Sequence, residues 1–180
     1  KGFNTPFWEE IRLDIDKDVK PDIVGTLTDM GLVNSGTIDA LYSSHNIEHL
    51  FPHEVPVALG EFNRVLNDDG FVVITCPDLV SVCQAVVSDK LMEPLYSSPA
   101  GPISPIDILY GHRGYIEQGK VYMAHNTGFT YTSLLKAFQE AGFTSFFGGS
   151  LPKTYDLWLI AFKQGRTEED LKKAAGEFLP

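Results

Sequence analysis

The chain has 180 residues, of which 43% are hydrophobic and 21% are charged, the composition of one soluble globular domain with a hydrophobic core. Its 24 acidic and 14 basic residues give a net charge of −10, which argues against nucleic acid as a main partner, because a phosphate backbone needs a concentrated basic surface. No apolar run approaches the roughly 20 residues that span a bilayer, and no apolar leader opens the chain, so we expect no membrane contact and a cytoplasmic location.

Hydrophobic spacing predicts strands that alternate with helices along the chain. The expected strands cover residues 11–15, 22–27, 38–44, 71–76, 143–148 and 156–162. The expected helices cover residues 53–66, where apolar residues recur at helical spacing, 130–141, with Thr130 as N-cap, and 168–178, with Thr167 as N-cap. The continuous apolar run at 71–76 is typical of a strand that is covered on both faces.

This alternation predicts an α/β fold with a parallel sheet. The alternation of strands and helices is interrupted between residues 81 and 126, where four prolines stand among glycines. We therefore predict a single domain over residues 1–180 with a loop-rich insertion at about 81–126. Insertions of this kind often shape substrate sites in α/β enzymes.

Four segments resemble class I S-adenosylmethionine-dependent methyltransferases of the small-molecule methyltransferase superfamily. Residues 38–50, IDALYSSHNIEHL, resemble the pattern FDxVxSxxxLEHL, and residues 61–70, EFNRVLNDDG, resemble ExxRVLKPGG. Residues 71–77 are similar to the strand that follows, and residues 135–143 to a late LxxLxxAGF helix and turn. The segments run in the family's order over most of the chain. The resemblance implies a Rossmann-like, doubly wound, mostly parallel sheet with helices on both faces.

The family also places a GxGxG loop after its first strand, ahead of the acid that ends the second strand. That acid corresponds to Asp14 here, and only Gly2 precedes it, so we expect a truncated domain without the first strand and the glycine loop. A non-catalytic, methyltransferase-like remnant that serves as a protein-interaction module is therefore an alternative. Strand edges without a neighbour invite pairing with another chain, which favours a homodimer.

The resemblance implies S-adenosylmethionine as cofactor, bound at the carboxyl ends of the strands. Asp14, or Asp16 as second choice, would accept hydrogen bonds from the cofactor ribose; an exposed acid in a turn is the alternative for either residue. Thr28 and Asp29 stand where the family contacts adenine. Thr26 could occupy the position of the acid instead, and Asp29 also suits a helix N-cap. Ser43 and Ser44 would flank the methionine part of the cofactor.

The expected reaction is methyl transfer to a small-molecule or glycan-type acceptor, a class favoured by the acidic charge and the resemblance. His45 is the candidate catalytic residue, because it follows a strand end and an imidazole can orient or deprotonate an acceptor. A packed histidine is the alternative, since alignment alone can suffice for methyl transfer. The substrate-binding candidates come from the insertion: Tyr110, His112, Arg113 and His125.

Residues 45–49, HNIEH, also match the HxxEH signature of inverted zinc proteases. Two histidines four apart on a helix can share a zinc ion, with the glutamate activating water. A zinc hydrolase with a third ligand from His53, His112 or His125 is thus a further alternative. The leading interpretation assigns no metal, because the motif coincides with the LEH position of the methyltransferase pattern.

Overall fold

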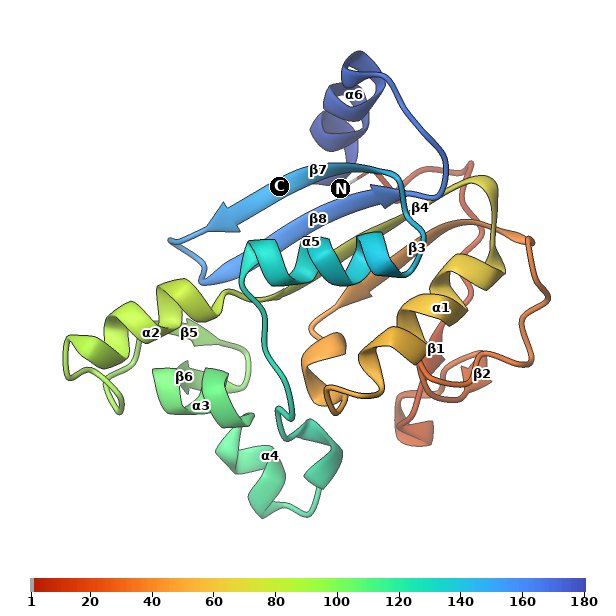
Figure 1. Cartoon of the computed structure of the whole chain (residues 1–180). Coiled ribbons are helices and arrows are strands. Elements are labelled where there is room, and N and C mark those ends of the chain that lie inside the picture. Colours follow the sequence, from red (N-terminus) through yellow and green to blue (C-terminus); the bar gives the residue numbers. More distant parts are fainter. Residues whose placement is uncertain (1) are drawn as a thin grey trace.

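The computed structural model describes residues 2–180, which form an α/β fold around a four-stranded sheet (Figure 1). The strand order is β3-β4-β8-β7, with β3 at Ile38–Ser44, β4 at Leu66–Pro77, β8 at Asp156–Phe162 and β7 at Ser145–Leu151. Strand β3 is parallel to β4, whereas β8 is antiparallel to both of its neighbours. The sheet is thus mixed rather than mostly parallel, because the short connection between β7 and β8 makes a hairpin, which pairs antiparallel strands.

Two further strands form a separate parallel pair. Strands β1 (Leu13–Asp14) and β2 (Ile23–Val24) pair over two residues each and are shorter than expected. Within residues 2–180, no ladder joins β1 to β3. A cavity of about 440 Å³ lies between them instead, with Leu13 on one wall and Leu41 on the other.

Helices cover both faces of the main sheet, as expected. Helices α1 (Val55–Val65) and α5 (Tyr131–Glu140) lie on the face that buries the side chains of Val72 and Ile74 (Figure 1). Helix α6 (Glu168–Phe178) packs with Val73 on the opposite face, since neighbouring residues of a strand point to opposite sides.

Side-chain caps explain where two of these helices begin. Thr130 accepts a hydrogen bond from the backbone N–H of Ser133, and Thr167 accepts one from the backbone N–H of Asp170. Each cap satisfies a backbone donor that the first helical turn leaves free. Gly142, in the left-handed conformation with φ of 91°, follows α5 and ends it.

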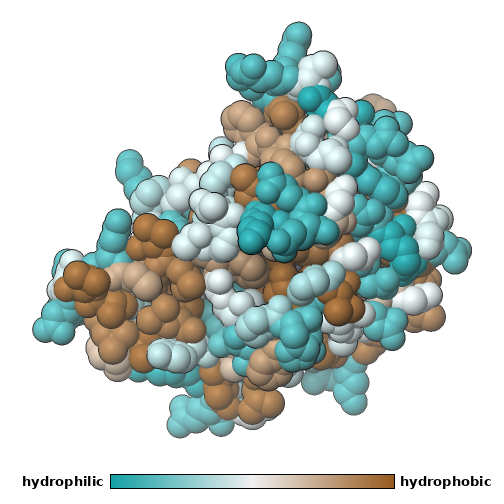
Figure 2. Space-filling model, viewed as in Figure 1, coloured by the Kyte–Doolittle hydropathy of each residue, from teal (hydrophilic) through white to brown (hydrophobic). Residues whose placement is uncertain are grey.

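The insertion contains more regular structure than its prolines suggested. Its elements are α2 (Leu79–Val87), β5 (Tyr96–Ser98), β6 (Gly101–Ile103), α3 (Pro105–Tyr110), α4 (Arg113–Glu117) and the 3-10 turn η3 (Val121–Met123). Val82, Ile103 and Ile108 form a small core of their own. Figure 2 shows hydrophobic residues gathered over the α2 end of the molecule. Val80 and Val87 of α2 have exposed side chains, as does Met92 further along the chain.

Two short 3-10 turns complete the elements, η1 (Lys17–Val19) and η2 (Ile47–His49). Within residues 2–180, no helix combines the length and the apolar character needed to cross a membrane.

Replacing Phe62 by alanine should lower the free energy of unfolding by about 3–5 kcal/mol, because its fully buried ring fills the space between α1 and the sheet. Urea denaturation measures the change. The matched control is Val57→Ala on the same helix, where the side chain is 52% exposed and the cost should stay near about 0.5 kcal/mol. Equal costs for the two variants would contradict this packing.

Candidate active site at the carboxyl end of the sheet

The backbone reverses sharply where β3 ends. His45 follows the strand with φ of 52°, in the left-handed region that residues with a side chain rarely adopt. Its backbone N–H donates to the carbonyl of Thr75 over 2.9 Å, which holds the reversal against β4. Ile47, fully buried, anchors the η2 turn in the main core. Backbone strain of this kind is found preferentially at functional sites.

Residues 43–46 separate two cavities. Ser43 and Asn46 line the cavity of about 440 Å³ between β1 and β3. His45 lines a second cavity of about 150 Å³, which the insertion and the start of β8 enclose. A group bound in one cavity would therefore lie close to a group bound in the other.

The smaller cavity gathers groups that can bind protons or metal ions. Four of the five histidines of the protein line it: His45, His49, His112 and His125. The cavity is also lined by two acids and two tyrosines, Asp107, Asp156, Tyr96 and Tyr155. These residues come from the β3–α1 connection, the insertion and the β7–β8 turn, which are far apart in the sequence. The cavity therefore exists only in the folded chain.

A carboxylate is buried beside this cavity. The Glu48 side chain is 1% exposed, and neither of its oxygens accepts a hydrogen bond within the described residues. An unsatisfied buried polar group costs about 1–3 kcal/mol, and more when it is charged. The nearest basic side chain among the described residues is His45, whose Nδ1 lies 3.3 Å from Glu48 Oε1 and whose Nε2 lies 3.5 Å from Asp156 Oδ1.

These contacts change the pKa of the groups involved. Burial opposes the charge of His45, but Glu48 and Asp156 outweigh it, so the pKa of His45 is raised. Burial also raises the pKa of Asp156 and lowers that of His125, which has no carboxylate in direct contact. The surroundings therefore shift the pKa values of these two imidazoles in opposite directions.

The close approach of two segments places His125 at the site. Gly111 follows α3 with φ of 95° and forms a bridge with Ala124; a Cβ at Gly111 would overlap the carbonyl oxygen of Met123. Only glycine permits this contact. His125 Nδ1 then lies 2.7 Å from the carbonyl oxygen of Ile108.

The predicted ribose ligands occupy different environments. Asp14 ends β1, accepts the backbone N–H of Asp16 over 2.7 Å and lines a cavity of about 490 Å³ on the N-terminal side of β3. Asp16 instead accepts hydrogen bonds from Tyr122 Oη over 2.7 Å and Lys120 Nζ over 3.1 Å. Asp16 thus joins the segment after β1 to the insertion, whereas Asp14 bonds locally, to the backbone two residues further on.

The other predicted cofactor residues are spread around the same region. Asp29 lines a cavity of about 350 Å³ beside β2 and accepts the backbone N–H of Gly31. The hydroxyl of Thr28 lies 2.8 Å from that of Thr26. Ser44 pairs with Thr75 in the β3–β4 ladder.

The predicted acceptor residues fall into two groups. His112 and His125 line the smaller cavity. Arg113 instead binds Asp107, with its Nε 2.7 Å from Oδ1, and lowers the pKa of that carboxyl despite burial. Tyr110 is 63% exposed and does not line the cavity.

Sequence reasoning assigned no role in methyl transfer to three residues of this site. Glu48 and His49 were considered only as members of the HxxEH motif, and the structure does not place that motif on a helix: His45 precedes the three-residue turn η2. His45 and His49 therefore do not lie on one face of a helix. Asp156 carries no sequence signal, because only the β7–β8 hairpin brings it to His45.

A family profile described as a methyltransferase domain matches residues 9–74. No curated protein matches the chain. Among solved structures, the PH0226 protein of Pyrococcus horikoshii is similar with a TM-score of 0.56 and 15% identity, over 88% of this chain and 74% of that one. A SAM-dependent methyltransferase of Archaeoglobus fulgidus is similar with a TM-score of 0.52 and 14% identity, over 83% and 73%.

The profile match over residues 9–74 agrees with the resemblance to methyltransferases, and the two solved structures share the α/β fold of this chain. Other matching structures are longer: the chain spans 35% of one from Nostoc punctiforme and 62% of one from Thermotoga maritima.

The site has room for the cofactor that the methyltransferase resemblance implies. The cavity between β1 and β3, of about 440 Å³, lies within the range of about 300–1,000 Å³ that is usual for cofactor sites. Its walls are mainly apolar, and Ser43 and Asn46 supply polar groups at the strand end. Asp14, at the end of β1, lines the adjoining cavity of about 490 Å³ instead, and an acid at a strand end can accept hydrogen bonds from ribose hydroxyls.

The link between Asp16 and the insertion should make stability depend on pH. The hydrogen bond from Tyr122, the backbone N–H of Asp18 and Lys120 lower the pKa of Asp16 from 3.8 to about 2. Because the folded-state pKa is depressed, this stabilisation is present above pH 3.8 and disappears as the pH falls toward 2.

Thermal melting between these pH values tests this dependence. In Tyr122→Phe, which removes the largest contribution, melting should depend less on pH in that window, and in Asp16→Asn the contribution should vanish. An Asp16→Asn profile identical to that of the unmodified protein would contradict the role of this contact.

Proposed function

We propose that this protein transfers a methyl group from S-adenosylmethionine to a small-molecule or glycan-type acceptor. The observation that carries the proposal is the turn at residues 43–46, which has the β1–β3 cavity on one side and the histidine-lined cavity on the other. Methyl transfer needs a donor and an acceptor held in line at short range, and two adjoining cavities supply this arrangement.

The β1–β3 cavity, together with the two adjoining cavities that Asp14 and Asp29 line, would hold the cofactor. Asp14 would accept hydrogen bonds from the ribose, Thr28 and Asp29 would lie toward the adenine, and Ser43 and Ser44 toward the methionine part. When bound, S-adenosylmethionine supplies a methyl group on a positively charged sulfur. The acidic groups near the site favour that positive charge.

The smaller cavity would bind the acceptor. His45 would orient the acceptor or take its proton, and the position of its ring on the cavity wall beside the turn supports this role. His112 and His125 would provide further polar contacts, and Tyr96 and Tyr155, whose rings stack at 6.2 Å, offer an aromatic wall. Hydroxyl-rich acceptors suit a wall of mixed polar and aromatic groups.

Asp14→Asn should weaken binding of S-adenosylhomocysteine by at least about tenfold, because charge-assisted hydrogen bonds to a ligand are worth about 1.5–3 kcal/mol. Isothermal titration calorimetry measures the loss. Asp18→Asn is the matched control, since Asp18 is an exposed acid in the turn that follows and should leave the affinity unchanged.

Two results would contradict the proposal. Unchanged affinity in Asp14→Asn would remove the assigned ribose ligand. No binding by the unmodified protein at millimolar ligand would overturn methyl transfer itself and favour the protein-interaction module, for which the unpaired edges of β1 and β3 are the structural argument.

A further inference from the structure

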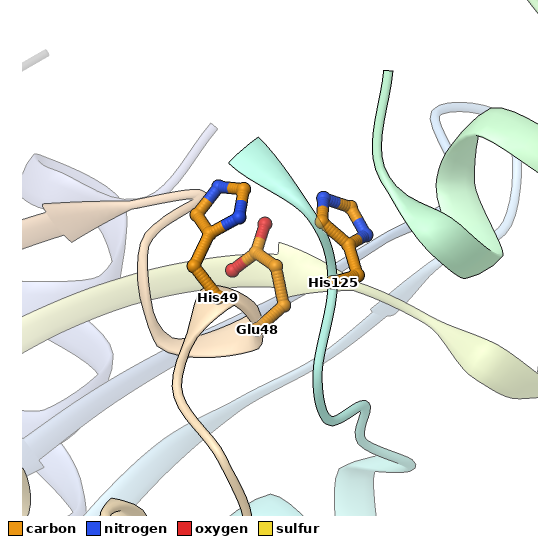
Figure 3. A group of neighbouring side chains, drawn as sticks. All are labelled: Glu48, His49 and His125. Atoms are coloured by element: carbon orange, nitrogen blue, oxygen red, sulfur yellow. The ribbon is translucent and has the colours of Figure 1, made fainter. Parts of the chain in front are cut away.

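We propose that Glu48, His49 and His125 form a binding site for a divalent transition-metal ion. Each side chain offers one ligand atom, and the three atoms all lie within 4.8 Å of one another. Figure 3 shows the Glu48 carboxylate between the two imidazole rings, with Glu48 and His49 on the turn after β3 and His125 on the segment that leads to α5.

The donor set selects the class of ion. Two imidazole nitrogens and one carboxylate oxygen suit Zn²⁺ and neighbouring ions such as Co²⁺ and Fe²⁺. Ca²⁺ and Mg²⁺ prefer oxygen ligands throughout and are disfavoured here. Three protein ligands also leave at least one coordination position open, as in catalytic rather than structural zinc sites.

The state of Glu48 is the strongest argument for a cation. Its side chain is 1% exposed, and both carboxylate oxygens lack hydrogen-bond donors within the described residues. A buried carboxylate is normally paired or bound to a metal. The His45 contact at 3.3 Å involves only Oε1, and the His45 side chain is 45% exposed, so this neighbour satisfies Glu48 incompletely.

Both histidines are oriented as metal ligands usually are. His49 Nδ1 lies 3.1 Å from the carbonyl oxygen of Ala124, and His125 Nδ1 lies 2.7 Å from that of Ile108. A carbonyl oxygen only accepts, so each Nδ1 must carry the proton. In the neutral ring this leaves Nε2 with a free lone pair, and such support of the second nitrogen is typical of metal-bound histidine.

The backbone holds the two halves of the site together without a metal. The carbonyl oxygen of Glu48 accepts the N–H groups of Asn126 and Thr127 over 2.9 and 3.1 Å. The Asn126 side chain donates to the carbonyl of His49 over 2.8 Å. The rings of His49 and His125 then meet edge to face, with centroids 4.8 Å apart. The site is therefore largely preformed.

Metal binding would require only a small inward movement of the side chains. Bonds from zinc to its ligand atoms are about 2.0–2.2 Å long, so ligand atoms around a bound ion lie closer to one another than 4.8 Å, the distance within which the three atoms lie here. His49 and His125 also line the cavity of about 150 Å³, so the open coordination position would face the proposed acceptor. The metal site itself does not depend on the proposed methyl transfer.

The test is Zn²⁺ binding by the full chain after dialysis against a chelator. Titration in competition with a chromophoric chelator should give one ion per chain. Glu48→Gln, His49→Gln and His125→Gln should each weaken binding by at least about tenfold. His112→Gln, in the same cavity, and His53→Gln, an exposed histidine nearby, are matched controls that should keep full affinity.

Thermal melting provides the second readout. Zn²⁺ should raise the melting temperature of the unmodified protein and of both controls but not of the three ligand variants, because a ligand stabilises only the state that binds it. Circular dichroism of the metal-free variants checks that they fold. Glu48→Gln keeps the size of the side chain and removes a buried charge, so it remains informative if a histidine variant fails to fold.

Two outcomes would overturn the proposal. The absence of saturable Zn²⁺ binding would leave His45 as the only counter-ion of Glu48. Binding that is lost in His45→Gln but retained in His125→Gln would assign the ion to the HxxEH pair instead of the three proposed ligands.

Discussion

The functional region depends on the contact between the η2 turn and the segment that leaves the insertion. The carbonyl oxygen of Glu48 accepts two backbone N–H groups from Asn126 and Thr127, while Ile47 anchors the same turn in the core. This contact joins the β3 end to the insertion and places α5 on the sheet. Without it, His125 would not reach His49, and the smaller cavity would lose a wall.

The same region contains a buried carboxylate and a strained backbone, both of which lower the stability of the fold. Glu48 is buried beside His45, and within residues 2–180 neither of its carboxylate oxygens accepts a hydrogen bond. His45 itself adopts a left-handed backbone conformation. Proteins retain buried charges and strained residues mainly where function requires them, since each lowers stability. The arrangement is therefore better explained by a ligand, a metal ion or an acceptor than by the fold's own needs.

Local sequence signals predicted the bounds of a helix or strand well where those signals alone decide the bounds. The bounds of β3, β8 and α6 agree with the expectation because apolar runs and the Thr167 cap act over neighbouring residues. Strands β1 and β2 are shorter than predicted because pairing, not propensity, decides strand length. The antiparallel direction of β8 depends on its partners and was missed for the same reason.

The sequence by itself determined the α/β class, the resemblance to methyltransferases and the acids and histidines available for chemistry. Only the tertiary structure decided which of them meet. It tied Asp16 and Arg113 to structural partners, and it brought His125 and Asp156 to His49 and His45. Local propensity acts over a few residues, whereas these contacts join segments tens of residues apart, and their geometry follows from the packing of the whole chain.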